Sequence, residues 1–269
     1  MASQASSVLI NFASSSAAAG KMGGTASSSR NLTNGTFAVQ TVASGSWNEI
    51  TATGDPVTYS QSIGLVDSSN QASGLSISNI NLPGGKGGGA TFSTFPTGNE
   101  DLTAKYGSAY GNAWKGGVSK SGNGSNSASL FTLSGFQAST TYTITLLCGR
   151  SNTYPSGDNT CGFSLSGIEG LASLTASAVT TGYAGAPVIG ENGSVTGIGV
   201  NAREMTEITW TFTTGEDTDG LDLSLVGTGD YNVNMIEINS LNVPEPATAS
   251  LSLLGLGLLV LRRKRSSAN

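Results

Sequence analysis

The arrangement of apolar and polar residues along most of this chain is typical of short β-strands separated by polar turns. Residues 141–148, TYTITLLC, show it most clearly, because Tyr142, Ile144 and Leu146 alternate with other residues and so share one face of a strand. Residues 75–80, LSISNI, alternate in the same way. Further strands are predicted at 8–12, 37–42, 47–53, 58–66, 129–133, 162–166, 174–180, 194–200, 207–213, 221–226 and 234–242. This succession predicts an all-β fold, an antiparallel β-sandwich or jelly roll.

Three segments depart from the strand pattern. Residues 14–30 are rich in Ser, Ala and Gly and are predicted to form a loop, as is the glycine-rich run at 83–89. A single helix is predicted from Glu100 to Tyr106. No internal repeat is evident, so residues 1–242 are interpreted as one β-sandwich domain, and residues 243–269 as a separate C-terminal segment.

The C-terminal segment has a composition unlike that of the domain before it. Its parts are the turn Val243-Pro244-Glu245-Pro246, the uncharged apolar run 247–261 and the basic tail Arg262, Arg263, Lys264 and Arg265. As a helix the apolar run would span roughly 23 Å, somewhat less than the ~30 Å hydrocarbon core of a bilayer. Snorkelling by the flanking cations makes up the difference. We therefore expect one transmembrane helix with its basic tail on the cytoplasmic side and the domain outside.

This order of turn, apolar helix and basic tail resembles the PEP-CTERM sorting signal of certain Gram-negative bacteria. In that family an exosortase, a membrane cysteine peptidase, cleaves near the Pro-Glu-Pro motif. The protein is then released or attached at the cell surface, often in an exopolysaccharide matrix. The resemblance covers about the last tenth of the chain and implies a destination, with an exosortase and the membrane as partners. A plain tail anchor and a buried core helix are the alternatives.

The N-terminal segment does not carry the export signal that this destination requires. Residues 1–12, MASQASSVLINF, lack the basic and apolar regions of a secretory signal. We expect either that the start codon is misassigned or that the signal has been removed, leaving residues 3–6, SQAS, as the remnant of a cleavage site.

The composition excludes several classes of function. The 269 residues include no histidine, which excludes Ser-His-Asp and Cys-His catalysis and histidine-ligated zinc, copper or iron. The net charge is −5 and the one cluster of cations is the basic tail, so nucleic-acid binding is not expected. We therefore expect a non-enzymatic surface or matrix protein that acts by adhesion, by matrix structure or by contact with glycans such as exopolysaccharide, with no cofactor other than a structural calcium ion.

Two cysteines, Cys148 and Cys161, flank a turn-rich segment. Because an exported protein meets an oxidising compartment, a disulfide between them is expected, and the alternative is two buried thiols. Asp217, Asp219 and Asp222 surround Gly220 and could offer oxygen ligands to a structural Ca²⁺. The alternative for these aspartates is a solvated hairpin turn.

Aromatic rings and carboxylates are the remaining candidates for glycan chemistry. Tyr106, Tyr110 and Trp114 fall in a Gly/Asn-rich segment expected to be a loop, where exposed rings would stack on sugars. The alternative is that they cap the core. Other aromatic candidates are Trp47, Tyr154 and Tyr183. A second functional hypothesis is therefore a carbohydrate-binding module with a defined sugar site.

A third hypothesis is a carboxylate-dependent glycosidase or lyase. Such an enzyme needs two facing carboxylates in a cleft. The candidates outside turns are Glu49, Glu169, Glu204 and Glu207.

Four segments of the domain also resemble galactose-binding-like jelly rolls of bacterial surface proteins. They are VLINF at 8–12, the stretch 129–150, EITWTFTT at 207–214 and DYNVNMIEI at 230–238. The resemblance is carried by these scattered pieces alone. It implies a jelly-roll body that either contacts carbohydrate or is purely structural, and it assigns no binding residues.

Overall fold

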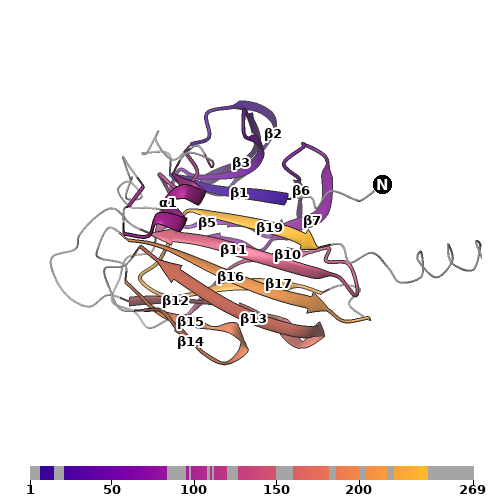
Figure 1. Cartoon of the computed structure of the whole chain (residues 1–269). Coiled ribbons are helices and arrows are strands. Elements are labelled where there is room, and N and C mark those ends of the chain that lie inside the picture. Colours follow the sequence, from indigo (N-terminus) through magenta and orange to yellow (C-terminus); the bar gives the residue numbers. More distant parts are fainter. Residues whose placement is uncertain are drawn as a thin grey trace, which may run out of the picture.

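The computed structural model describes residues 7–14, 21–83, 95–96, 98–107, 110, 112–119, 127–149, 160–181, 186–199, 204–216 and 221–241 (Figure 1). Its strands form two large sheets. The eight-stranded sheet has the spatial order β13 (Leu171–Thr180), β16 (Met205–Thr214), β11 (Thr141–Gly149), β19 (Met235–Leu241), β1 (Ser7–Ser14), β4 (Gly45–Ala52), β3 (Gly35–Val42) and β2 (Thr25–Leu32).

The second large sheet has seven strands. Their order is β14 (Val188–Ile189), β15 (Val195–Gly199), β12 (Thr160–Ser166), β17 (Leu223–Gly229), β10 (Ala128–Ser134), β7 (Ala72–Ser78) and β6 (Ile63–Val66). Two short pairs complete the strands, β5 (Val57–Tyr59) with β8 (Ile80–Leu82) and β9 (Val118–Ser119) with β18 (Asn232–Val233). The described helices connect strands. They are α1 (Glu100–Tyr106) between β8 and β9, and the 3₁₀ turns η2 (Ile168–Gly170) between β12 and β13 and η3 (Glu191–Gly193) between β14 and β15.

The connection order is that of a jelly roll. In one sheet β1, β19, β11 and β16 are successive neighbours, and in the other β10, β17, β12 and β15 are. If these eight strands are numbered 1 to 8 along the chain, the order across one sheet is 1-8-3-6 and the order across the other is 2-7-4-5. This pair of strand orders is the one found in jelly rolls. The remaining strands extend the sheets at their edges. The predicted all-β sandwich is therefore confirmed, and a parallel pairing of β1 with β4 is the departure from a purely antiparallel arrangement.

The main core lies between the inner faces of the two sheets. Phe12 of β1 stacks on Phe131 of β10 with ring centroids 5.8 Å apart, so the rings join one sheet to the other. The predicted inward face of β11 is confirmed, because Tyr142, Ile144 and Leu146 are all buried in this core. Alternating side chains of the two sheets thus supply the hydrophobic stabilisation that a sandwich requires.

The structure corrects some predicted boundaries. Residues 14–30 are not one loop, because β2 begins at Thr25 and pairs with β3 across a tight turn in which Asn34 has a φ of +55°. The side chains of β2 are almost all exposed, so the strand has no apolar alternation to reveal it. The single strand predicted at 58–66 is divided between β5 and β6, which lie in different sheets.

The predicted glycine-rich loop from residue 84 onward and the predicted transmembrane run at 247–261 lie outside the described residues. Within the described residues, none of the helices combines the length and the apolar character needed to cross a membrane.

Candidate functional site

A second apolar cluster covers the outer face of the eight-stranded sheet, on the side away from the main core. We call it the outer cluster, and its buried members are Leu9, Met22, Trp47, Phe95, Leu102, Tyr106, Ala113, Trp114, Leu147, Met205 and Met235. Strand residues of β1, β4, β11, β16 and β19 form its base, and α1 with Tyr110, Ala113 and Trp114 covers it. Figure 1 shows α1 above the ends of β11 and β19.

Local sequence explains why α1 forms and how it is oriented. The side chain of Asn99 caps the helix by accepting a hydrogen bond of 3.1 Å from the backbone N–H of Leu102. Glu100 and Asp101 lie in the first turn, where negative charge is favourable. Leu102 and Tyr106 are four residues apart, so both point from one face of the helix into the outer cluster. The predicted helix from Glu100 to Tyr106 is confirmed.

The aromatic residues proposed to hold sugars are packed together. The Tyr106 ring lies 5.0 Å from the Tyr110 ring and 6.0 Å from that of Phe95, which in turn lies 5.4 Å from Trp114. Tyr106 is fully buried and Trp114 is only 3% exposed. The prediction of an exposed stacking platform is therefore wrong for these two rings, because they fill the space between α1 and the sheet.

The other aromatic candidates do not rebuild this platform. Tyr110 is half-buried, with its ring 6.0 Å from that of the buried Trp47. Tyr154 and Tyr183 lie outside the described residues. Within the described part of the chain, these aromatic side chains therefore act mainly as packing for the outer cluster.

Two carboxylates at the border of the outer cluster bind the tyrosines. Glu207 of β16 accepts hydrogen bonds from the Tyr106 hydroxyl and from Lys105 Nζ, the latter at 2.6 Å. Glu237 of β19 accepts from the Tyr110 hydroxyl at 2.8 Å and from Ser7 Oγ at 3.0 Å. Both glutamates flank β11, where Glu207 lies opposite Leu147 and Glu237 opposite Thr145.

Burial raises the pKa of Tyr106 far above its usual value, and the hydrogen bond to Glu207 and the negative charges nearby raise it further. Burial is also the main cause of the raised pKa of Tyr110, followed by the charge of Glu237 and the hydrogen bond to it. Both phenols therefore stay protonated at neutral pH and act as hydrogen-bond donors.

A third carboxylate, Glu49 of β4, is buried under the N-terminal part of the chain. It accepts hydrogen bonds from Asn11 Nδ2 at 2.9 Å, from the backbone N–H of Met22 at 2.8 Å and from Thr51 Oγ1 at 3.4 Å. Of the two other candidate carboxylates, Glu204 is buried directly before β16 and Glu169 is exposed in η2. Glu49, Glu207 and Glu237 are thus all held by donors of their own chain.

Sequence reasoning named Glu207 but missed Glu237 and Lys105. Glu237 lies between Ile236 and Ile238 in β19, where alternation directs it to the sheet face opposite the main core. That alternation was the available signal. The partners of Glu237 could not be predicted, because Tyr110 is 127 residues away in the sequence.

Cys148 and Cys161 are both buried in the main core and are free thiols in the structure. Cys148 belongs to β11 and Cys161 to β12, so they come from opposite sheets. Burial raises the pKa of Cys161 to about 12, with a further increase from the charge of Asp230. Burial also raises the pKa of Cys148, and the nearby Cys161 adds to this effect. The disulfide between them stays a prediction.

The candidate calcium ligands are only partly described. Asp222 accepts a hydrogen bond of 2.5 Å from Ser134 Oγ, while Asp217 and Asp219 lie outside the described residues. Among the residues that the structure describes, no group of three Cys, Asp or Glu side chains is placed to hold a metal ion.

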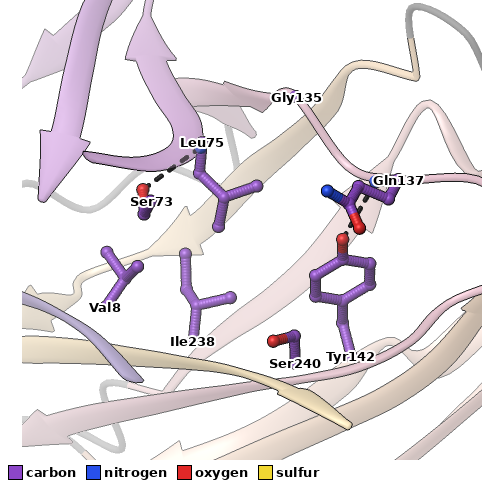
Figure 2. A pocket seen from close by; sticks show the side chains of 8 residues that line it. All are labelled: Val8, Ser73, Leu75, Gly135, Gln137, Tyr142, Ile238 and Ser240. Carbon is purple, nitrogen blue, oxygen red and sulfur yellow. Dashed lines mark hydrogen bonds between the residues drawn. The ribbon is translucent and has the colours of Figure 1, made fainter. Parts of the chain in front are cut away.

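Two hollows lined by described residues are candidate binding sites. The smaller one, about 120 Å³, lies between residues of β1, β7, β11 and β19, among them Val8, Leu75, Tyr142 and Ile238 (Figure 2). There Tyr142 OH accepts a hydrogen bond of 2.9 Å from the backbone N–H of Gln137. A larger hollow of about 310 Å³ lies over β12, β15 and β17. Its lining is Thr160, Cys161, Gly162, Phe163, Ser164, Ser194, Val195, Thr196, Gly197, Thr228 and Gly229. The first is too small for a sugar ring with its substituents, since ligand pockets usually hold ~300–1,000 Å³.

Comparison with known proteins identifies the C-terminal segment. Residues 242–265 match the family described as the PEP-CTERM protein-sorting motif, which includes Val243-Pro244-Glu245-Pro246 and the basic tail Arg262–Arg265. No curated protein and no solved structure matches the chain. The matched residues lie outside the part that the structure describes. The chain thus carries a PEP-CTERM sorting signal, which directs it by export and an exosortase to the cell surface or extracellular matrix of a Gram-negative-type bacterium.

Proposed function

We propose that the jelly-roll body is a non-enzymatic structural or adhesive module, which the sorting signal delivers to the cell surface or matrix. The observation that supports this most is that the candidate carboxylates accept hydrogen bonds from other residues of the chain. With no histidine in the chain, Asp and Glu are the main candidates for general acids and bases. Glu49, Glu207 and Glu237 are each engaged by donors of their own chain, which favours a role in holding segments together.

A carboxylate-dependent glycosidase is the less favoured reading. It needs one carboxylate free to protonate the leaving group and a second placed across the sugar. Glu207 and Glu237 are instead bound by the hydroxyls of Tyr106 and Tyr110, which donate hydrogen bonds to their carboxylates. The same contacts explain the glutamates as anchors for α1 and for Tyr110.

A contact with glycans is the second candidate function, and the larger hollow favours it. Its lining includes the hydroxyl side chains of Ser164, Thr196 and Thr228, which can donate and accept hydrogen bonds as sugar hydroxyls do. Gly197 has a positive φ angle, and a side chain there would meet only Val188, at 4.0 Å, so its backbone is open to approach. Its volume of about 310 Å³ lies at the lower end of the range for ligand pockets.

The experiment that tests the proposal incubates the full chain with exopolysaccharide and measures the release of new sugar ends. We expect none above the buffer control. Release that disappears in Glu207→Gln but persists in the matched surface variant Glu169→Gln would overturn the non-enzymatic proposal. A glycan array on the same protein tests the second candidate, for which Thr196→Arg should abolish binding and Ser29→Arg, on the exposed strand β2, should not.

A further inference from the structure

One edge strand of the eight-stranded sheet, β13, has an outer side that no described strand pairs with, although at its end Asn99 Nδ2 donates a hydrogen bond of 3.4 Å to the C=O of Thr180. The backbone N–H of Thr181 donates to Met205 O at 3.0 Å, and this contact fixes the alternation of the ladder between β13 and β16. Odd-numbered residues of β13 therefore bond to β16, and Leu174, Ala176 and Ala178 direct their N–H and C=O groups to the open side. Among the described residues, none bonds to these outward groups.

The other sheet edges carry features that discourage pairing, and β13 largely lacks them. The edge strand β2 contains Arg30 and a register shift between Ala26 and Ser28. The edge strands β6 and β14 have four and two residues. In contrast, β13 runs without a register shift from Ser173 to Thr180 and contains no charged residue, proline or glycine. Short strands, charges and bulges are the usual means by which proteins protect an edge.

Exposed apolar side chains gather at this same edge. Of the four large hydrophobic residues that are exposed in the described part of the chain, three lie here: Val179 of β13 and Val188 and Ile189 of β14, at 42%, 60% and 43%. The fourth, Leu241, ends β19, three strands away from β13 in the sheet. Strands β13 and β14 lie together at the bottom of the view in Figure 1. The inward residues Leu174, Ala176 and Ala178 are only half-buried, because the edges of the two sheets leave this side of the core partly open.

We propose that β13 pairs with β13 of a second copy of this chain, antiparallel about a two-fold axis at Ala176. In this register Leu174 of one copy lies opposite Ala178 of the other, and the outward backbone groups form about six hydrogen bonds between the copies. On the outer face Thr175 lies opposite Ser177 of the other copy, so two hydroxyl groups meet. The eight-stranded sheets of the two copies become continuous, and the inward apolar residues gain cover.

A second copy is the occupant that the charges favour. Each chain has a net charge of −5, so two copies repel each other wherever their acidic residues meet. The strands β13 and β14 contain no charge, so the paired strands themselves oppose no like charges; the nearest exposed acidic residues are Glu169 and Glu191, in the adjoining turns η2 and η3. A two-fold interface requires one patch to be complementary to itself, and a short uncharged strand with small side chains meets that requirement.

The proposal is tested by sedimentation velocity of the full chain in detergent, which keeps the sorting signal from driving association. We expect a protein mass twice the 27.0 kDa of one chain at micromolar concentration. The double variant Thr175→Lys, Ser177→Lys places lysines opposite each other, and its dissociation constant should rise at least about tenfold. The matched control Ser29→Lys adds charge to the exposed strand β2 and should leave the dimer intact.

A cysteine variant tests the register independently of these charges. In Ala176→Cys the two new thiols meet on the axis, so oxidation should give a covalent dimer, whereas Ser29→Cys should give none. Thermal unfolding of each variant, expected within a few degrees of the natural chain, verifies that the fold is kept. A monomeric natural chain, a dimer that persists in the double lysine variant, or equal cross-linking of the two cysteine variants would overturn the proposal.

Discussion

The hydroxyl of Tyr106, the last residue of α1, donates a hydrogen bond to Oε2 of Glu207 on β16, although the two residues are 101 positions apart in the sequence. The same carboxylate oxygen accepts Lys105 Nζ at 2.6 Å, and the side chain of Glu207 is only 14% exposed. A single carboxylate therefore fixes the end of the helix to the outer face of the sheet. Packing of Leu102 and Tyr106 in the outer cluster supports the same contact.

Tyr106→Phe removes this hydrogen bond while keeping the ring. We expect the free energy of unfolding to fall by about 1–2 kcal/mol, because the lost bond goes to a charged acceptor that keeps its ion pair with Lys105. The measurement is urea denaturation. The matched control is Tyr59→Phe, whose hydroxyl bonds to the exposed Gln61 at 3.1 Å and should change stability by less than about 0.5 kcal/mol. Equal losses in the two variants would show that Glu207 does not hold the helix.

Stability is also expected to fall at alkaline pH. The pKa values of Tyr106 and Tyr110 are raised in the folded protein above their ordinary value of 10. The unfolded chain therefore releases these protons first, so their contribution is complete below pH 10 and is lost as the pH rises above it. Unfolding midpoints measured across this range should drop less steeply in the double variant Tyr106→Phe, Tyr110→Phe. If the midpoints of the double variant fall with pH as steeply as those of the natural chain, the two tyrosines do not cause the loss of stability.

The exported protein is expected to contain a disulfide between Cys148 and Cys161. Both thiols are buried in one core, and export takes them through an oxidising compartment. Protein from the cell surface, alkylated in denaturant without reductant, should gain no alkyl group, and after reduction it should gain two. Reduction should lower the free energy of unfolding by roughly 3 kcal/mol. Full alkylation without reductant would establish two buried thiols instead.

Much of the fold could be predicted because its signals are local. The helix α1 is specified by the cap at Asn99 and by the spacing of Leu102 and Tyr106. The strand β11 is specified by alternation. The strand β2 was missed because its exposed side chains give no alternation, and its position depends on backbone pairing with β3. Pairing of this kind is set by tertiary structure, which overrides local preference.

The outer cluster could be predicted only in part. Leu146 and Leu147 are successive apolar residues of β11, and both are fully buried, which shows that each face of this strand is covered. This pair was the signal that the sheet has a second apolar face. The covering residues Tyr106 and Trp114 were expected to be exposed, because the segment around them is rich in glycine and asparagine. Their burial depends on contacts between distant parts of the sequence.

The sorting signal at residues 242–265 delivers the jelly-roll domain to the cell surface or matrix. The most direct test is the intact mass of the protein recovered from the native cell surface. We predict a chain that ends near Pro246 and lacks the apolar run and the basic tail. A surface protein that keeps its full tail through Arg265 would show that no exosortase processes this chain.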